Sequence, residues 1–268
     1  MSIARGWILA CAIVLGLPKQ APAQEQRAAD TVDVPVGSDL IDGARARAHV
    51  VHAEQLRLSG DSAVSMAAMT WTIASRDSAG VRLRTVHGEG DSPRPDGSIG
   101  HPSIDYTLDL GTLAPRTFNV HQRGGGPGPV LSLTFDGASV RGDRSTGGSA
   151  QPVDVTLPRA AFLASLADLV AEALPRRTGS VYRVLMWQPG MGEPVTHLYQ
   201  TLGREDVDVL GVTYRGAWIV VDKGTDGAEL GRMWMVDHPP YMVRWNFVTP
   251  TGDRMRLDQR LENAAPKH

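Results

Sequence analysis

Apolar and polar residues alternate along most of the chain, and this alternation predicts β-strands that bury one face. The stretch VRLRTVH at residues 81–87 is a clear example. Similar runs recur between turn-forming Gly, Pro, Asp and Asn residues from residue 41 to residue 262, and we count about 12 of them. Because strands precede and follow a single helix, without strand–helix alternation, the order excludes doubly wound folds and βα barrels.

One segment departs from the alternation. Residues 157–175, LPRAAFLASLADLVAEALP, place apolar side chains at steps of three and four, the spacing of one face of an α-helix. Pro158 suits the first helical position, and Pro175 cannot continue a helix. The pattern therefore predicts a helix over residues 158–174, with Asp168 and Glu172 facing away from its apolar stripe.

These elements predict a mainly β protein, with a curved antiparallel sheet or half-barrel of about 12 strands and one central amphipathic helix packed on its concave face. The first three strands, up to residue 87, are expected to form an antiparallel meander that begins with a long strand over residues 44–58 containing a candidate bulge. Residues 88–100 and 124–129 are rich in glycine and proline, and we expect both to be exposed loops.

The N-terminus has the anatomy of a secretory signal peptide. Residues 1–23 combine a basic start at Arg5, an apolar run, and small residues before a cleavage point after Ala23. The run is too short to cross a bilayer, and no later stretch reaches the roughly 20 apolar residues of a membrane helix. We therefore expect a periplasmic or secreted product that does not span the membrane. The chain's one cysteine, Cys11, continues the apolar run, and lipidation there is the less favoured alternative.

The rest of the chain divides into three parts. Residues 24–40 lack periodicity and are expected to be a flexible lead-in, residues 41–262 a single β-rich domain, and residues 263–268 a frayed tail. Signal cleavage removes two of the 27 basic residues and leaves 25 against 29 acidic residues. That balance argues against a nucleic-acid partner. The glycine-rich run at 124–129 lacks the lysine and helix of a phosphate loop, and we expect no cofactor.

Two stretches echo each other. YTLDLGTLAPRTFNV and MWMVDHPPYMVRWNF each run as strand, acid, proline turn and strand, with Asp109 and Asp237 as the acids. A duplicated unit would explain this echo, and so would two unrelated hairpins.

The signatures Asp109-Leu110-Gly111-Thr112-Leu113-Ala114-Pro115 and Trp234-Met235-Val236-Asp237 carry a family resemblance. With the signal peptide, the strands and the single helix, the chain resembles a family of bacterial envelope proteins of unknown function. It is also similar to the half-barrel group that includes periplasmic lipoprotein carriers and outer-membrane lipoprotein receptors. The resemblance, over about residues 41–262, implies a curved antiparallel sheet that holds a helix against its concave face. It also implies a lipid, lipoprotein or envelope-protein partner.

Sequence motifs for catalysis or metal binding are weak. His49, His52 and Glu54 form the densest set of potential metal ligands, but strand residues three apart point to opposite faces, so we expect no metal site. Asp237 and His238 form the one polar cluster suited to a hydrolase, and capping of a Pro-Pro turn is their simpler role.

We therefore expect a non-enzymatic envelope protein that binds a lipid, another apolar ligand or a partner in a groove between the sheet and the helix. The candidate groove residues are Phe162, Leu166, Leu169 and Ala173 from the helix and Trp71, Trp218 and Trp234 from strands. One alternative is a secreted hydrolase that acts on cell-wall or polysaccharide material through Asp237 and His238. The other is a structural module that binds a partner protein along a sheet edge.

Overall fold

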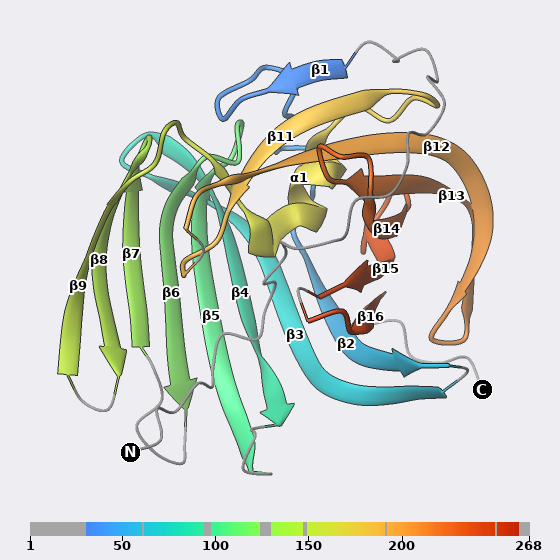
Figure 1. Ribbon diagram of the computed structural model, residues 1–268, viewed down its shortest axis with the longest axis horizontal. Coiled ribbons are helices and arrows are strands. Elements are labelled where there is room, and N and C mark those ends of the chain that lie inside the picture. The colour runs from blue at the N-terminus through green and yellow to red at the C-terminus, as the bar shows by residue number, and fades with distance from the viewer. Residues whose placement is uncertain are drawn as a thin grey trace.

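Sixteen strands form one sheet in the computed structural model, which describes residues 31–60, 62–93, 98–123, 130–146, 149–190, 192–249 and 251–262. Two antiparallel meanders account for most of it, and β16 pairs with β2 to join them into a continuous sheet (Figure 1). The first meander comprises β2 (His49–Ser59), β3 (Ser62–Ser78), β4 (Val81–Pro93), β5 (Ile99–Asp109), β6 (Pro115–Arg123), β7 (Val130–Asp136), β8 (Ser139–Thr146) and β9 (Ser149–Thr156). The second comprises β11 (Val181–Trp187), β12 (Val195–Val209), β13 (Val212–Lys223), β14 (Glu229–Met235), β15 (Met242–Val248) and β16 (Arg254–Leu261).

The predicted fold class is confirmed: the protein is mainly β, with a large curved sheet and one short helix. The sheet holds sixteen strands instead of about 12 partly because two short strands, β1 (Thr31–Val34) and β10 (Phe162–Leu163), pair in parallel with β11. Strands of two and four residues are too short to show a periodic pattern, so only their long-range partner identifies them.

The predicted meander at the start of the domain is confirmed as β2, β3 and β4. A register shift between Gln55 and Leu56 provides the expected bulge. The β3–β4 turn places Ala79 and Gly80 at φ values of 48° and 80°, which suits the right-handed twist of a hairpin. The first strand begins at His49, however, and not at residue 44, because the chain from 43 to 46 is in turns.

The expected loop at residues 88–100 is wrong over most of its length. Strand β4 continues to Pro93 and β5 begins at Ile99, while residues 94–97 and the expected loop at 124–129 lie outside the described residues. Gly88 lies opposite Trp71 of β3, and a Cβ atom on it would come within 2.4 Å of the indole ring. The glycine is therefore part of the strand and leaves room for a large neighbour.

We expect the substitution Gly88→Ala to lower the free energy of unfolding by about 1–3 kcal/mol, because the indole of Trp71 would have to move. Urea titration would measure this. Gly192→Ala is the matched control, since a Cβ atom there meets nothing within 4 Å. Equal midpoints for the two variants would contradict the close contact between Gly88 and Trp71.

The lead-in expected over residues 24–40 contains a short strand, whereas residues 35–40 lie in turns and irregular structure. Residues 31–34 form β1 along β11, and the side chain of Val34 is 2% exposed. Residues 24–30, the signal peptide at 1–23 and the tail at 263–268 lie outside the described residues. The burial of Val34 explains why a short polar segment is nevertheless ordered on the sheet.

The central helix is shorter than the predicted 158–174. One 3-10 turn, η1 (Ala164–Leu166), leads into α1 (Ala167–Ala173), and Phe162 and Leu163 instead pair with Met186 and Trp187 of β11. This long-range pairing overrides the local helical pattern at the N-terminal end. The C-terminal end agrees with the prediction, since Leu174 is extended before Pro175.

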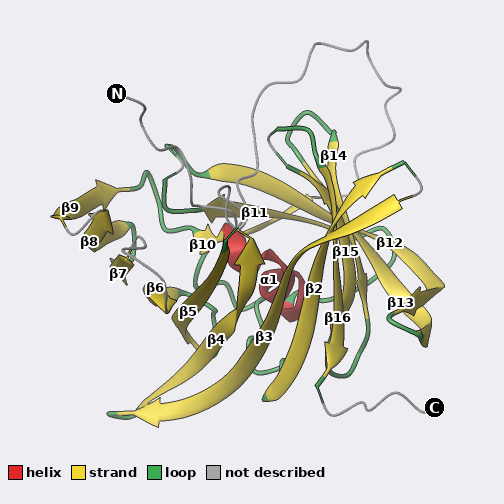
Figure 2. Ribbon diagram, turned by 90° about the horizontal axis from the view of Figure 1, so that it is seen from below, coloured by secondary structure: helices red, strands yellow, loops and turns green. Residues whose placement is uncertain are grey.

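Helix α1 lies inside the curve of the sheet (Figure 2). The main hydrophobic core joins α1 to both meanders, since one cluster of buried residues includes Leu169 of the helix, Tyr106 of β5 and Tyr199 of β12. A second, smaller core of Val207, Val209, Ala217, Trp234, Val236 and Val243 lies within β12–β15 and the turn after β14. The helix thus packs on the concave face, as the sequence predicts.

Candidate functional site

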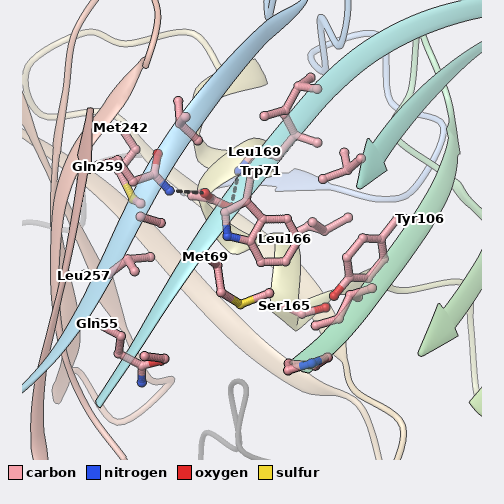
Figure 3. A pocket seen from close by; sticks show the side chains of 18 of the residues that line it. Gln55, Met69, Trp71, Tyr106, Ser165, Leu166, Leu169, Met242, Leu257 and Gln259 are labelled. Carbon is pink, nitrogen blue, oxygen red and sulfur yellow. Dashed lines mark hydrogen bonds between the residues drawn. The ribbon is translucent and has the colours of Figure 1, made fainter. Parts of the chain in front are cut away.

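A cavity of about 570 Å³ lies between α1 and the concave face of the sheet, and it is partly open to the outside. Its volume is within the roughly 300–1,000 Å³ of small-molecule sites. Its walls come from strands β2–β8, from β15 and β16, and from the helix (Figure 3). Most of the lining is apolar, including Val51, Met69, Ile73, Val86, Ile104, Val120, Leu131, Leu166, Leu169, Met242, Trp245, Phe247 and Leu257.

An aromatic row forms part of the cavity wall. The rings of Trp71 and Tyr106 are stacked with centroids 6.4 Å apart, and those of Tyr106 and Phe118 with centroids 4.8 Å apart and planes 7° from parallel. The row crosses from β3 to β6, and Gly88 on β4 lets the indole lie against the backbone. The row is an apolar part of the lining that a hydrocarbon chain can contact.

The structure brings together three of the seven expected groove residues. Trp71, Leu166 and Leu169 line the cavity. The other four do not: Phe162 is 1% exposed in β10, Ala173 is packed in the core, Trp218 stacks under the guanidinium of Arg204, and Trp234 belongs to the smaller core. Their hydrophobicity was the signal that selected them, but it does not separate packing from lining.

The polar side of α1 also faces the interior, a placement that the amphipathic pattern does not predict. Ser165, Asp168 and Glu172 all line the cavity. Gln188 caps the helical segment by accepting a hydrogen bond from the Ser165 amide at 3.1 Å. Gln259 of β16 donates a long hydrogen bond of 3.5 Å to Asp168 (Figure 3). Amphipathic spacing identifies a polar helix face, but it does not tell whether that face meets solvent or a cavity.

Burial dominates the electrostatics of these two acids. It raises the pKa of Asp168, and the hydrogen bond from the Leu169 amide only partly opposes this. Burial also raises the pKa of Glu172 well above its usual value, and the charge of Asp168 raises it further. Three arginines, Arg176, Arg84 and Arg45, act in the opposite sense. The carboxyl of Glu172 is therefore held toward its neutral form.

This shift predicts a pH dependence of stability. The folded protein retains the proton of Glu172 at pH values where the unfolded chain, with a pKa near 4.5, has lost it. The free energy of unfolding should therefore fall as pH rises from about 4.5 through the raised pKa of Glu172.

Urea titrations of the wild type and Glu172→Gln across this pH range would test the dependence. Asp168 and the arginines are present in both proteins, so the difference between them isolates Glu172. We expect the variant to gain stability relative to the wild type as pH rises. A difference that does not change with pH would contradict the raised pKa.

Asp237 and His238 do not line the cavity. Asp237 pairs with Arg176 at 3.0 Å and Arg204 at 3.4 Å, and although burial opposes it, these contacts lower the pKa of Asp237. His238 contacts the carbonyl of Pro239 within its own turn. The hydrolase interpretation requires a carboxyl with a raised pKa in a cleft, and Asp237 has neither property.

The two echoing hairpins, β5–β6 and β14–β15, are both present. Their aspartates differ in role, since Asp109 accepts hydrogen bonds from Gly111 and Thr112 within its own turn, whereas Asp237 pairs with distant arginines. Among the described residues, no cluster of three or more His, Asp or Glu side chains is placed to hold a metal ion. None of the helices described is both long and apolar enough to cross a membrane.

The fold and the cavity define a class of protein: a mainly β chain whose open curved sheet surrounds one helix and an apolar cavity. Residues 63–258 match the model of a family described as protein of unknown function (DUF3108), and the chain belongs to that family. Among solved structures, it is similar to a β-barrel-like protein of domain of unknown function DUF1849 from Brucella abortus, with 10% identity and a TM-score of 0.49. That match covers 83% of this chain and all of the other. No curated protein matches the chain.

Proposed function

We propose that this protein is a non-enzymatic binding protein of the cell envelope that holds a lipid or similar amphiphile between its sheet and its helix. The observation that carries the proposal is the apolar cavity of about 570 Å³ beside α1. The predicted signal peptide at residues 1–23 supports export to the envelope. The resemblance to lipoprotein carriers and receptors supports an acyl chain as the bound group.

The arrangement of carboxyl groups does not favour the hydrolase alternative. A glycosidase needs two carboxyls on opposite sides of the bond that it cleaves. Asp168 and Glu172, the two acids with raised pKa values at the cavity, lie one turn apart on the same side of one helix.

The sheet edge offers less support for a pure interaction module. Strand β9 ends the sheet next to β8, and it contains Pro152, which has no N–H group for pairing with another strand. The cavity is the feature with the size and lining of a ligand site, so binding in the cavity is the function that the geometry supports best.

Titration of the mature protein with a neutral, environment-sensitive naphthylamine dye would test the proposal. We expect saturable binding with about one dye per protein, and displacement of the dye by lauroyl-chain amphiphiles. Dye fluorescence that rises without saturation, or that lauroyl compounds fail to displace, would contradict a cavity for one amphiphile.

A further inference from the structure

Three polar side chains on one side of the helical segment face the cavity. Ser165, Asp168 and Glu172 are spaced by three and four residues, so they lie in a row along the helix. Leu166 and Leu169, also in the lining, flank this row. The cavity therefore has an apolar surface on the sheet and a polar strip on the helix.

The polar strip holds hydrogen-bonding atoms that lack partners. Ser165 Oγ and Glu172 Oε1 are buried and make no hydrogen bond with any residue that the structure describes, and Glu172 is only 5% exposed. Leaving a buried polar atom unpaired is unfavourable, and folded proteins rarely do so without a reason. A ligand group in the cavity would supply the missing partners.

The neighbouring cations do not supply them. Arg84 bonds to the carbonyls of Gly43 and Ala46, and Arg45 bonds to the carbonyl of Leu174. Neither arginine lines the cavity. Both act electrostatically on Glu172, as does Arg176, whose guanidinium is paired with Asp237.

These groups select against a charged ligand head at the helix. A carboxylate head would face the carboxyl groups of Asp168 and Glu172, and an ammonium head would add a cation to a buried region where three arginines already act on Glu172. A hydroxyl group both donates and accepts hydrogen bonds, so it can pair with either protonation state of Asp168 or Glu172.

Resting on the proposed function, we propose that the ligand is a neutral amphiphile with a hydroxyl-bearing head, of the acylglycerol class. Its head bonds to Ser165, Asp168 and Glu172, and its chain lies along the row of Trp71, Tyr106 and Phe118. The site discriminates by the head group, whereas the aromatic row accepts any hydrocarbon chain of suitable length.

Dye displacement by four ligands with the same lauroyl-length chain would test the assignment: lauroylglycerol, methyl laurate, laurate and dodecylamine. We expect lauroylglycerol to bind about tenfold more tightly than methyl laurate, which has no hydrogen-bond donor. Ser165→Ala should weaken lauroylglycerol about threefold and leave methyl laurate unchanged. Ser75→Ala is the control, because Ser75 is exposed on β3 and does not line the cavity, and it should change neither.

The other outcomes separate this assignment from the proposed function. Equal affinities for lauroylglycerol and methyl laurate would overturn the head-group assignment and keep the cavity as a chain-binding site. Tightest binding of laurate, lost in Arg144→Ala, would also overturn it, since Arg144 lines the cavity from β8 without an ion pair among the described residues. Failure of all four ligands to displace the dye would instead contradict the proposed function.

Discussion

Replacing Ala67 with tryptophan is expected to weaken dye and lipid binding by at least about tenfold. Ala67 lies on β3 opposite Gln55, and both residues line the cavity. An indole at this position would occupy space that the ligand needs, and the ligand would lose the burial of its chain, worth about 25 cal/mol per Å². The dye titration measures the effect directly.

The neighbouring residue provides a matched control. Ala68 lies on the same strand opposite Glu54 and Asp91, and it is absent from the cavity lining because successive strand residues point to opposite faces. Ala68→Trp should bind the dye as the wild type does. If Ala67→Trp remains folded by urea titration and still binds normally, the cavity is not the binding site.

Replacing Asp222 with alanine is expected to lower the free energy of unfolding by about 3–5 kcal/mol. Asp222 and His197 are each 1% exposed, and the ring of His197 lies 2.9 Å from both carboxylate oxygens. Removing the carboxylate leaves His197 buried without its partner, which is the unfavourable half of a broken buried pair. The urea midpoint reports the loss.

Asp154→Ala is the control for this substitution. Asp154 pairs with Arg141 at 3.6 Å, with both side chains about 70% exposed, and such a pair contributes about 0–1 kcal/mol. We expect the stability of Asp154→Ala to stay close to that of the wild type. Similar losses of unfolding free energy in the two variants would contradict a large contribution of the buried pair of His197 and Asp222 to stability.

The period of two along the strands was enough to predict the fold class, because a sheet with one buried face leaves that pattern in each long strand. Turn-forming residues also predicted where strands end, as at Ala79 and Gly80 between β3 and β4. The short strands β1 and β10 carry no such pattern, since they exist through pairing with β11. Phe162 shows where a local pattern fails. Its spacing in the sequence is helical, but the residue lies in a strand and pairs with Met186 of β11.

The glycines of β4 led to the wrong prediction of a loop. Gly88 and Gly90 suggested a loop, yet both lie within β4, where Gly88 leaves room for Trp71 and a Cβ atom on Gly90 would come within 2.1 Å of the Ala68 carbonyl oxygen. A glycine in a turn and a glycine under a large side chain look alike in one sequence. The tertiary neighbour decides which of the two applies.

The candidate site was predicted in outline but not residue by residue. The helix and Trp71 were placed at the groove, whereas Tyr106 and Phe118 of the aromatic row were not singled out. Asp168 and Glu172 were read only as the polar side of a helix, because hydropathy does not tell solvent from a buried cavity.

Native mass spectrometry of the wild-type protein, purified from its own envelope, tests the central claim most directly. The account predicts a mass above that of the mature chain by one bound amphiphile, which lipid extraction would release and identify. A population containing only the unliganded mass, in a protein that also gives no saturable dye binding, would contradict the proposal that the cavity is a lipid site.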